Sequence, residues 1–365
     1  MARSLVSPYA AQALALARTV MRASRAYRAS PLRIARLARR ARAEGGYEYP
    51  EALTSGLLDP SAPPELLGRH ASKHATLDAQ RRVNPEEFSP LTEEKAIFYR
   101  FLEAAGLPSR RLLGVIGHGT GWGRGGVVVT SLPAFSTWLD ALPESFVVKP
   151  SAGVHGQGVR VVVREGSRFV ALDRGEVTPE ALYRTMTDDP VFPLWVVQER
   201  VRNSPEPPFL GAAEAVQTAR IVTVVHPDGT TGVAHGLLKL AAPGAVIDNY
   251  RGGTTGNSLA VVGPGGRLGP VLSRRPDGCG FVESAVVPGT GLRVEGEVLP
   301  AWNEAVAMVR RGAALLLPAR TIGWDVAFTP DGPSVIEANM WWDPPPTPDQ
   351  GSAVRRISDP TAGAA

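Results

Sequence analysis

The chain has 365 residues, of which 44% are hydrophobic and 20% charged. This is the composition of an ordinary globular enzyme with a core large enough for two or three domains. Its single cysteine, Cys279, excludes internal disulfides and cysteine-based metal clusters. No run of 18 apolar residues occurs, so we expect no membrane-spanning helix and a cytoplasmic location.

The net charge of +4 is unevenly distributed, because residues 1–45 hold ten arginines against Glu44 alone. The residues between the arginines favour two helices, divided at Pro31. Such a basic segment suits a membrane-surface or nucleic-acid arm. We favour the alternative of a helical extension whose apolar residues pack on the domain behind it. Those residues are Leu14, Leu16, Val20, Met21, Leu32, Ile34 and Leu37.

Two regions follow before the first candidate site. Residues 46–90 are punctuated by proline and charge and predict no long element. An amphipathic helix is predicted from Thr92, as its N-cap, to Ala105, because Gly106 is a typical stop signal.

Residues 145–163 predict a strand, a glycine-rich loop and a second strand, and the first strand ends at Lys149. The loop glycines are Gly153, Gly156 and Gly158. A loop without Cβ atoms can close over phosphates and offer backbone N–H donors, while the lysine adds a fixed positive charge. His155, in the same loop, is a candidate nucleotide contact or an ordinary surface histidine. The segment alone fits a plain hairpin loop equally well, since no Walker A or dinucleotide fingerprint is present.

Turn and cap signals predict three further elements. Thr178 caps a helix that runs to Met186, with Pro179 at the first helical position. Residues 221–225 and 232–240 alternate across a Pro-Asp-Gly turn and predict a hairpin. A long helix is predicted from about residue 300 to 317.

Residues 322–339 carry the most informative signal of the chain. Two apolar runs flank the turn sequence Pro-Asp-Gly-Pro and predict a β-hairpin. Glu337 and Asn339 are two residues apart and leave the second strand on one face, while Asp325 lies at a matching distance on the first strand. Two carboxylates and an amide form an all-oxygen site suited to Mg²⁺, with Mn²⁺ as an alternative ion. An exposed polar face of a sheet is the competing interpretation of this segment.

A phosphate loop followed by such a hairpin resembles the ATP-grasp superfamily, and the likeness covers residues 90–345. It is closest to the sugar-transfer-associated branch, which is related to α-L-glutamate ligases. The motifs that carry it include Val148-Lys149-Pro150, Val197-Gln198-Glu199-Arg200-Val201, Thr218-Ala219-Arg220, Asp248-Asn249-Tyr250-Arg251-Gly252-Gly253 and Ile336-Glu337-Ala338-Asn339. The resemblance implies an α+β fold in which two subdomains grip ATP between them, here preceded by the arginine-rich helical extension.

The same resemblance implies a domain division and roles for single residues. The divisions are the extension 1–45, a region 46–140 before the grasp fold, a small subdomain 141–205 with the phosphate loop, a large subdomain 206–345 with the Mg²⁺ site, and a flexible tail 346–365. The ATP-binding residues are Lys149, Gly153, Gly156, Gly158, Gln198, Glu199, Val201 and Lys95, although an exposed surface lysine explains Lys95 equally well. The metal ligands are Asp325, Glu337 and Asn339. The catalytic residues are Arg220 on the transferred phosphoryl group, Lys239, and Asn249 in a loop that positions the acceptor or the γ-phosphate.

Three functions fit this pattern. The first is a carboxylate–amine or carboxylate–thiol ligase that forms ADP and an acyl phosphate, with a small-molecule acid and nucleophile as substrates. The second is a phosphotransferase on the same scaffold, and the third is a nucleotide-binding accessory protein of glycan or capsule assembly. The intact site residues argue against the third function, because a protein without turnover would tend to lose one of them. Nothing in the sequence separates the first two, so we expect the ligase with the phosphotransferase as its alternative.

Overall fold

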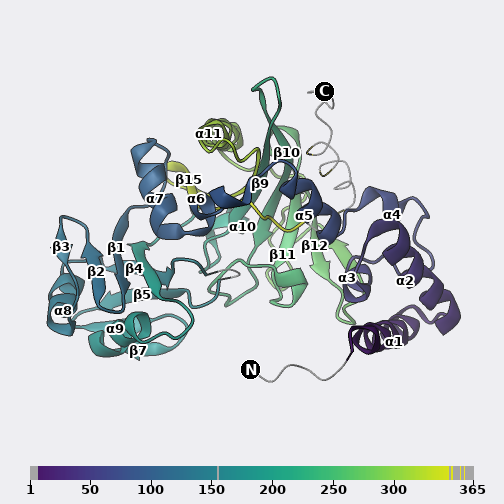
Figure 1. The fold of residues 1–365 in the computed structure, drawn as a ribbon, viewed down its shortest axis with the longest axis horizontal. Helices are drawn as coiled ribbons and strands as arrows, with labels where there is room; N and C mark the ends of the chain where they lie inside the picture. Colours follow the sequence, from purple (N-terminus) through teal and green to yellow (C-terminus); the bar gives the residue numbers. More distant parts are fainter. Residues whose placement is uncertain (1–6, 154–155, 345–346, 348–353, 355–356, 358–365) are drawn as a thin grey trace.

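The computed structural model describes residues 7–153, 156–344, 347, 354 and 357, and these residues form two antiparallel sheets (Figure 1). The first sheet has the strand order β3-β2-β1-β8-β4-β5-β6-β7, and the second has the order β13-β12-β11-β10-β9-β14-β15. The strands of the first are β1 Leu112–Gly117, β2 Thr120–Gly123, β3 Val127–Val128, β4 Ser145–Pro150, β5 Arg160–Glu165, β6 Arg168–Ala171, β7 Gly175–Val177 and β8 Leu194–Glu199. Those of the second are β9 Thr218–Val225, β10 Thr231–Leu240, β11 Ser258–Val262, β12 Leu268–Arg274, β13 Phe281–Ser284, β14 Thr321–Thr329 and β15 Gly332–Asn339.

Helices cover both sheets and join them. Helices α8 (Leu132–Asp140) and α9 (Pro179–Thr187) share a core with the first sheet, and α11 (Trp302–Leu315) packs on the second. Helix α10 (Pro208–Gly211) lies in the connection between the sheets. Helix α7 (Lys95–Ala104) touches β1 and β8, and its Phe98 ring lies 6.4 Å from the ring of Trp324 on β14. This helix is therefore placed at the junction of the two sheets (Figure 1).

Most elements predicted from turn and cap signals are present. The strand–loop–strand segment corresponds to β4 and β5, and the two predicted hairpins correspond to β9–β10 and β14–β15. Thr178 caps α9 through a hydrogen bond that its side chain accepts from the Ala181 amide. The prediction for Thr92 is wrong, because this residue lies inside the short helix α6 (Pro90–Glu93). The backbone at Glu94 is extended, and the Lys95 N–H bonds to the Ser151 carbonyl, so α7 begins only at Lys95.

Short helices occupy the region that the sequence left without a long element. They are α3 Tyr49–Thr54, α4 Leu66–Arg69, α5 Lys73–Arg81 and η1 Glu86–Phe88. Gln80 on α5 donates to the Trp342 carbonyl, and Asn84 donates to the carbonyls of Thr321 and Met340. These buried bonds fix the ends of β14 and β15. Their effect is to hold the hairpin that carries the predicted metal ligands.

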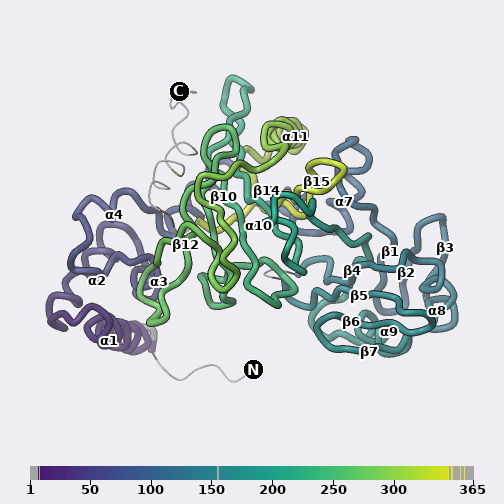
Figure 2. Tube along the Cα trace, turned by 180° about the vertical axis from the view of Figure 1, so that it is seen from behind, coloured from purple at the N-terminus to yellow at the C-terminus, as the bar shows by residue number. Residues whose placement is uncertain are grey.

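The arginine-rich segment folds into α1 (Pro8–Tyr27) and α2 (Pro31–Gly45), at the end of the molecule opposite the first sheet (Figure 2). As predicted, Pro31 begins the second helix. Val20 and Ile34 are buried in a small core with residues of α3 and with Cys279. The packing prediction is wrong for Leu14, Met21 and Leu32, whose exposed fractions are 47%, 57% and 78%. No helix among the described residues is long and apolar enough to cross a membrane.

Candidate active site

The β14–β15 hairpin has the register that its sequence predicts. Asp325 lies directly opposite Glu337, and Asn339 lies opposite Gly323. The register shifts between Asp325 and Val326, so one residue of β15, Ile336, has no partner across the ladder. Such a bulge leaves a backbone carbonyl free to bond elsewhere. Tyr99 of α7 donates its hydroxyl hydrogen to this carbonyl, and the hairpin is thereby tied to the helix at the junction of the sheets.

Asp325 is the centre of a buried ion-pair cluster on the second sheet. Arg220 on β9 faces it across the ladder and bonds both carboxylate oxygens, at 2.6 and 3.0 Å. Lys239 on β10 contributes a third contact, 2.8 Å from Oδ2. Burial acts to raise the pKa of Asp325, but the two cations hold it well below its usual range. The carboxylate is therefore ionised at neutral pH, and both predicted catalytic cations are oriented by it.

Lys95 connects the glycine-rich loop with the hairpin. It is buried, so the surface-lysine alternative is wrong. Its Nζ lies 3.0 Å from Oε1 of Glu337 and donates to the Gly153 carbonyl at 2.6 Å. The preceding residue, Glu94, accepts a hydrogen bond from the Ser151 hydroxyl. The first turn of α7 is thus bonded to both segments that carry predicted ligands.

Lys149 is a buried cation without a carboxylate within ion-pairing distance among the described residues. Its ammonium donates to the Tyr99 hydroxyl at 2.7 Å and lies 4.9 Å from the centre of that ring. Burial lowers the pKa of Lys149 to about 8, while the more distant charges of Glu337 and Asp325 oppose the shift. A buried charge satisfied only by a neutral hydroxyl is costly, so the site favours a bound anion beside Lys149.

The glycine-rich loop lies against the long segment that connects β10 and β11. Gly156 and Gly158 both have φ of +69°, which favours glycine, and a Cβ on Gly156 would come within 2.8 Å of the Ile247 side chain. A side chain at either position would strain the loop or displace its neighbour. Two loop residues, Val154 and His155, lie outside the described residues, and His155 as a nucleotide contact stays a prediction.

The predicted adenine-binding residues line the end of β8, next to the strand that carries Lys149. Gln198 and Val201 are buried, and the Gln198 amide donates to the Arg110 carbonyl. Glu199 pairs with Arg111 at 2.7 Å, so its carboxylate is already engaged. The backbone groups at the end of β8, rather than the Glu199 side chain, are therefore available to contact adenine.

Asp248 and Asn249 are neighbours in the sequence but make different contacts in the structure. The Asn249 side chain accepts a hydrogen bond from the Arg251 amide and stabilises its own loop. Asp248 is the residue that reaches β9, where it accepts bonds from the backbone and hydroxyl of Thr218, two residues from Arg220. Burial raises the pKa of Asp248, and the charge of Lys239 opposes this. Tyr99 was missed as a site residue; its position four residues after Lys95, on one helix face, was the signal in the sequence.

A model of the family described as sugar-transfer associated ATP-grasp matches residues 76–348. No curated protein matches the sequence. Solved structures with a similar fold include a complex of N5-carboxyaminoimidazole ribonucleotide synthetase with ADP, at 12% identity over 68% of this chain and 45% of that chain, with a TM-score of 0.38. This chain thus spans less than half the length of that structure.

Two other solved structures are similar to this chain over a larger share of their own length. The D-cycloserine synthetase DcsG has 17% identity over 75% of this chain and 72% of that chain, with a TM-score of 0.41. D-alanyl-alanine synthetase A from Vibrio cholerae has 11% identity over 80% and 70% of the two chains, with a TM-score of 0.44.

Proposed function

The chain belongs to the family of sugar-transfer-associated ATP-grasp proteins, and we propose that it is an ATP-dependent ligase joining a small carboxylic acid to an amine or a thiol. The ATP-grasp fold that the sequence predicts is confirmed by this membership. In the proposal, residues 141–205 and 206–345 are the two subdomains that grip ATP, and the reaction takes place in the cytoplasm.

The observation that carries the proposal is the buried ammonium of Lys149 beside a glycine-rich loop, where no carboxylate of the described residues pairs with it. Lys95 adds a second buried cation at that loop, where its ammonium donates to the Gly153 carbonyl. The phosphates of ATP would supply the anion that Lys149 lacks. Gln198, Glu199 and Val201 would hold adenine and ribose, mainly through the backbone.

The donor set of the hairpin fits Mg²⁺. Asp325 is held ionised, Glu337 lies opposite it, and only one of the Glu337 oxygens is paired, with Lys95. Asn339 adds an amide oxygen two residues further along β15. We assign these three residues as metal ligands, with Mn²⁺ as an alternative ion. A bound metal would neutralise phosphate charge at this site.

After ATP and the metal are bound, the proposed ligase reaction has two chemical steps, and residues of this chain would assist both. An oxygen of the substrate carboxylate attacks the γ-phosphorus, the bond to the bridging oxygen breaks, and ADP leaves. Arg220 uses Nε and Nη2 on Asp325, so its Nη1 remains to stabilise the transferred phosphoryl group. The nucleophile then attacks the acyl carbon, loses its proton, and inorganic phosphate leaves. Lys239 orients Asp325, and the loop with Asp248 and Asn249 would position the acceptor.

Because burial lowers the pKa of Lys149, we expect the affinity for ATP to depend on pH. With its pKa at about 8, the free protein loses this charge above that pH, and ATP binding must then restore it with a proton from solvent. The affinity for ATP should therefore fall about 30-fold between pH 7 and pH 9.5. Lys149→Met should weaken binding at pH 7 and remove this dependence, whereas Tyr99→Phe, which keeps the ring, should have a smaller effect. Titration calorimetry measures the ATP affinity of each protein at pH 7 and at pH 9.5. The control is Lys73→Met, at an exposed lysine. Wild-type affinity in Lys149→Met would contradict the assignment.

The function itself is tested by a screen of amino acids, hydroxy acids and sugar acids for acid-dependent release of ADP. A ligase should yield a hydroxamate when hydroxylamine is added, because hydroxylamine traps an acyl phosphate. A stable phosphorylated product without hydroxamate would favour the phosphotransferase. ATP binding without turnover of any acid would favour the accessory protein.

A further inference from the structure

The outer face of α1 is the strongest surface feature that the proposed reaction does not use. Along this face, Leu14 and Met21 are exposed and alternate with Arg18, Arg22 and Arg25. Arg18 follows Leu14 by four residues, and Met21, Arg22 and Arg25 follow Arg18 by three, four and seven, so all five lie on one side of the helix. The opposite side is buried through Val20 and Ala23. Helix α1 is thus held to the molecule by one side and presents a mixed apolar and basic side to solvent.

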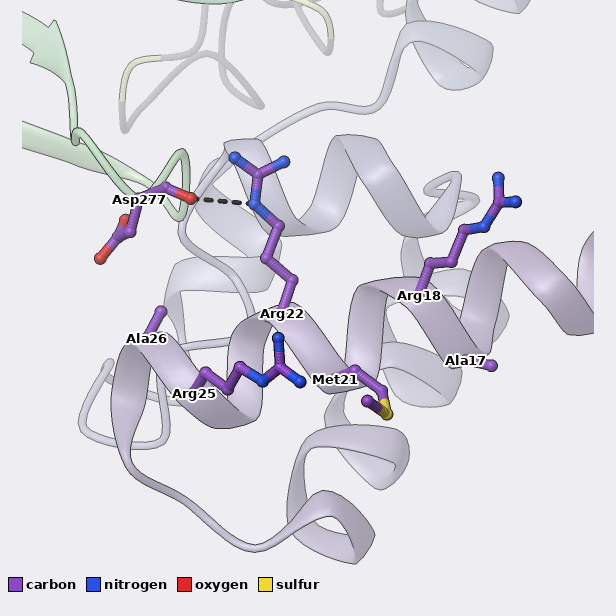
Figure 3. A pocket seen from close by; sticks show the side chains of 7 residues that line it. All are labelled: Ala17, Arg18, Met21, Arg22, Arg25, Ala26 and Asp277. Atoms are coloured by element: carbon purple, nitrogen blue, oxygen red, sulfur yellow. Dashed lines mark hydrogen bonds between the residues drawn. The ribbon is translucent and has the colours of Figure 1, made fainter.

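A hollow of about 660 Å³ lies on this face, between α1 and the turn that follows β12 (Figure 3). Arg18, Arg22 and Arg25 line it together with Met21. Asp277 is its one lining carboxylate, and that carboxylate is paired with Arg275 at 2.9 Å. The Arg22 Nε donates to the Asp277 carbonyl, which orients the side chain over the hollow (Figure 3).

The charged residues of α1 and α2 are almost all positive. Residues 8–27 include no acidic residue, and among residues 28–45 only Glu44 is acidic, where it pairs with Arg40. Nine arginines lie between residues 8 and 45. A surface of this kind attracts an anionic partner at long range, and its exposed leucine and methionine gain free energy only if that partner also offers an apolar phase.

We propose that the outer face of α1 docks on an anionic lipid surface, with phosphate headgroups at Arg18, Arg22 and Arg25 and with Leu14 and Met21 at the headgroup–acyl boundary. The apolar side chains decide between this partner and a nucleic acid, whose phosphates would use the arginines but leave Leu14 and Met21 in water. The helix lies on the membrane and does not span it. This docking is independent of the proposed ligase activity.

Co-sedimentation of the full chain with vesicles tests the proposal. Vesicles of phosphatidylglycerol and phosphatidylcholine should bind the protein, pure phosphatidylcholine vesicles should not, and binding should weaken with salt. Arg18→Gln/Arg25→Gln should reduce partitioning about 30-fold. Leu14→Gln/Met21→Gln should reduce it about 10-fold. All four residues are exposed, so these variants should keep the wild-type melting temperature.

The matched control is Arg168→Gln/Arg310→Gln, which removes the same charge from exposed arginines on β6 and α11. It should bind vesicles nearly as the wild type does. The proposal is overturned if both vesicle types bind equally, if neither binds, or if the control loses as much binding as the α1 arginine variant. Tighter binding to duplex DNA or RNA, unchanged by Leu14→Gln/Met21→Gln, would instead identify a nucleic-acid surface.

Discussion

Replacing Asp325 by asparagine should lower the free energy of unfolding by about 3 kcal/mol, because it leaves two largely buried cations without their counter-ion. Arg220 and Lys239 both bond this carboxylate, and its own exposure is small. The wild-type contribution should also depend on pH. A carboxyl whose folded pKa is lowered stabilises the protein above its unfolded pKa, near 4, and loses that effect as the pH falls toward the lowered value. Asp325→Asn should not show this acid-dependent loss.

Urea unfolding at pH 7 and pH 3 measures the loss of stability in Asp325→Asn and the pH dependence of stability in the wild type. The control is Asp331→Asn, at an exposed carboxylate in the turn of the same hairpin, which should change stability by less than about 0.5 kcal/mol. A triple replacement, Arg220→Met/Lys239→Met/Asp325→Leu, removes all three charges together and should be more stable than Asp325→Asn. A loss below about 1 kcal/mol in Asp325→Asn would show that the cluster is solvated or rearranged.

The local part of the site was predictable from sequence, since it depends on spacing along one hairpin and one loop. Two residues of separation placed Glu337 and Asn339 on one face, and the Pro-Asp-Gly-Pro turn brought Asp325 within one residue of the position opposite Glu337. The bulge at Ile336 supplies the last residue of this register, and the sequence did not predict that bulge. The bonds of Asp325 to Arg220 and Lys239 were not predictable in the same way. They join β14 to the β9–β10 hairpin, which is distant in the chain, and spacing within a strand does not show which strands become neighbours.

The errors have physical causes of the same kind. Helical periodicity correctly shows which residues of α1 share a face, but it does not show which face is covered, and so Leu14 and Met21 were assigned to the core. Thr92 is a good N-cap by residue type, yet the Ser151 carbonyl accepts a hydrogen bond from the Lys95 amide, and the N-cap moves two residues along the chain to Glu94. In both cases the outcome depends on tertiary contacts, which the local sequence signal does not contain.

Replacing Arg220 by lysine should reduce kcat by about 10²–10³-fold while changing the affinity for ATP by less than about threefold. Lysine keeps the charge next to Asp325 but has no planar fork, so it cannot bond both oxygens of Asp325 and still present a donor to the phosphoryl group. The nucleotide contacts assigned to Lys149 and the end of β8 are on other elements and should be unaffected.

The measurement compares acid-dependent ADP release and hydroxamate formation in the variant and the wild type, with ATP affinity and melting temperature determined on the same samples. Arg267→Lys, at an exposed arginine just before β12, is the control and should keep kcat. A large drop in melting temperature together with weaker Mg²⁺-ATP binding would mean that Arg220 acts by holding Asp325 in place. A kcat within threefold of the wild type, in a stable variant, would remove Arg220 from the transition state. The split between kcat and ATP affinity therefore distinguishes a residue that contacts the transferred phosphoryl group from one that only supports the metal ligand.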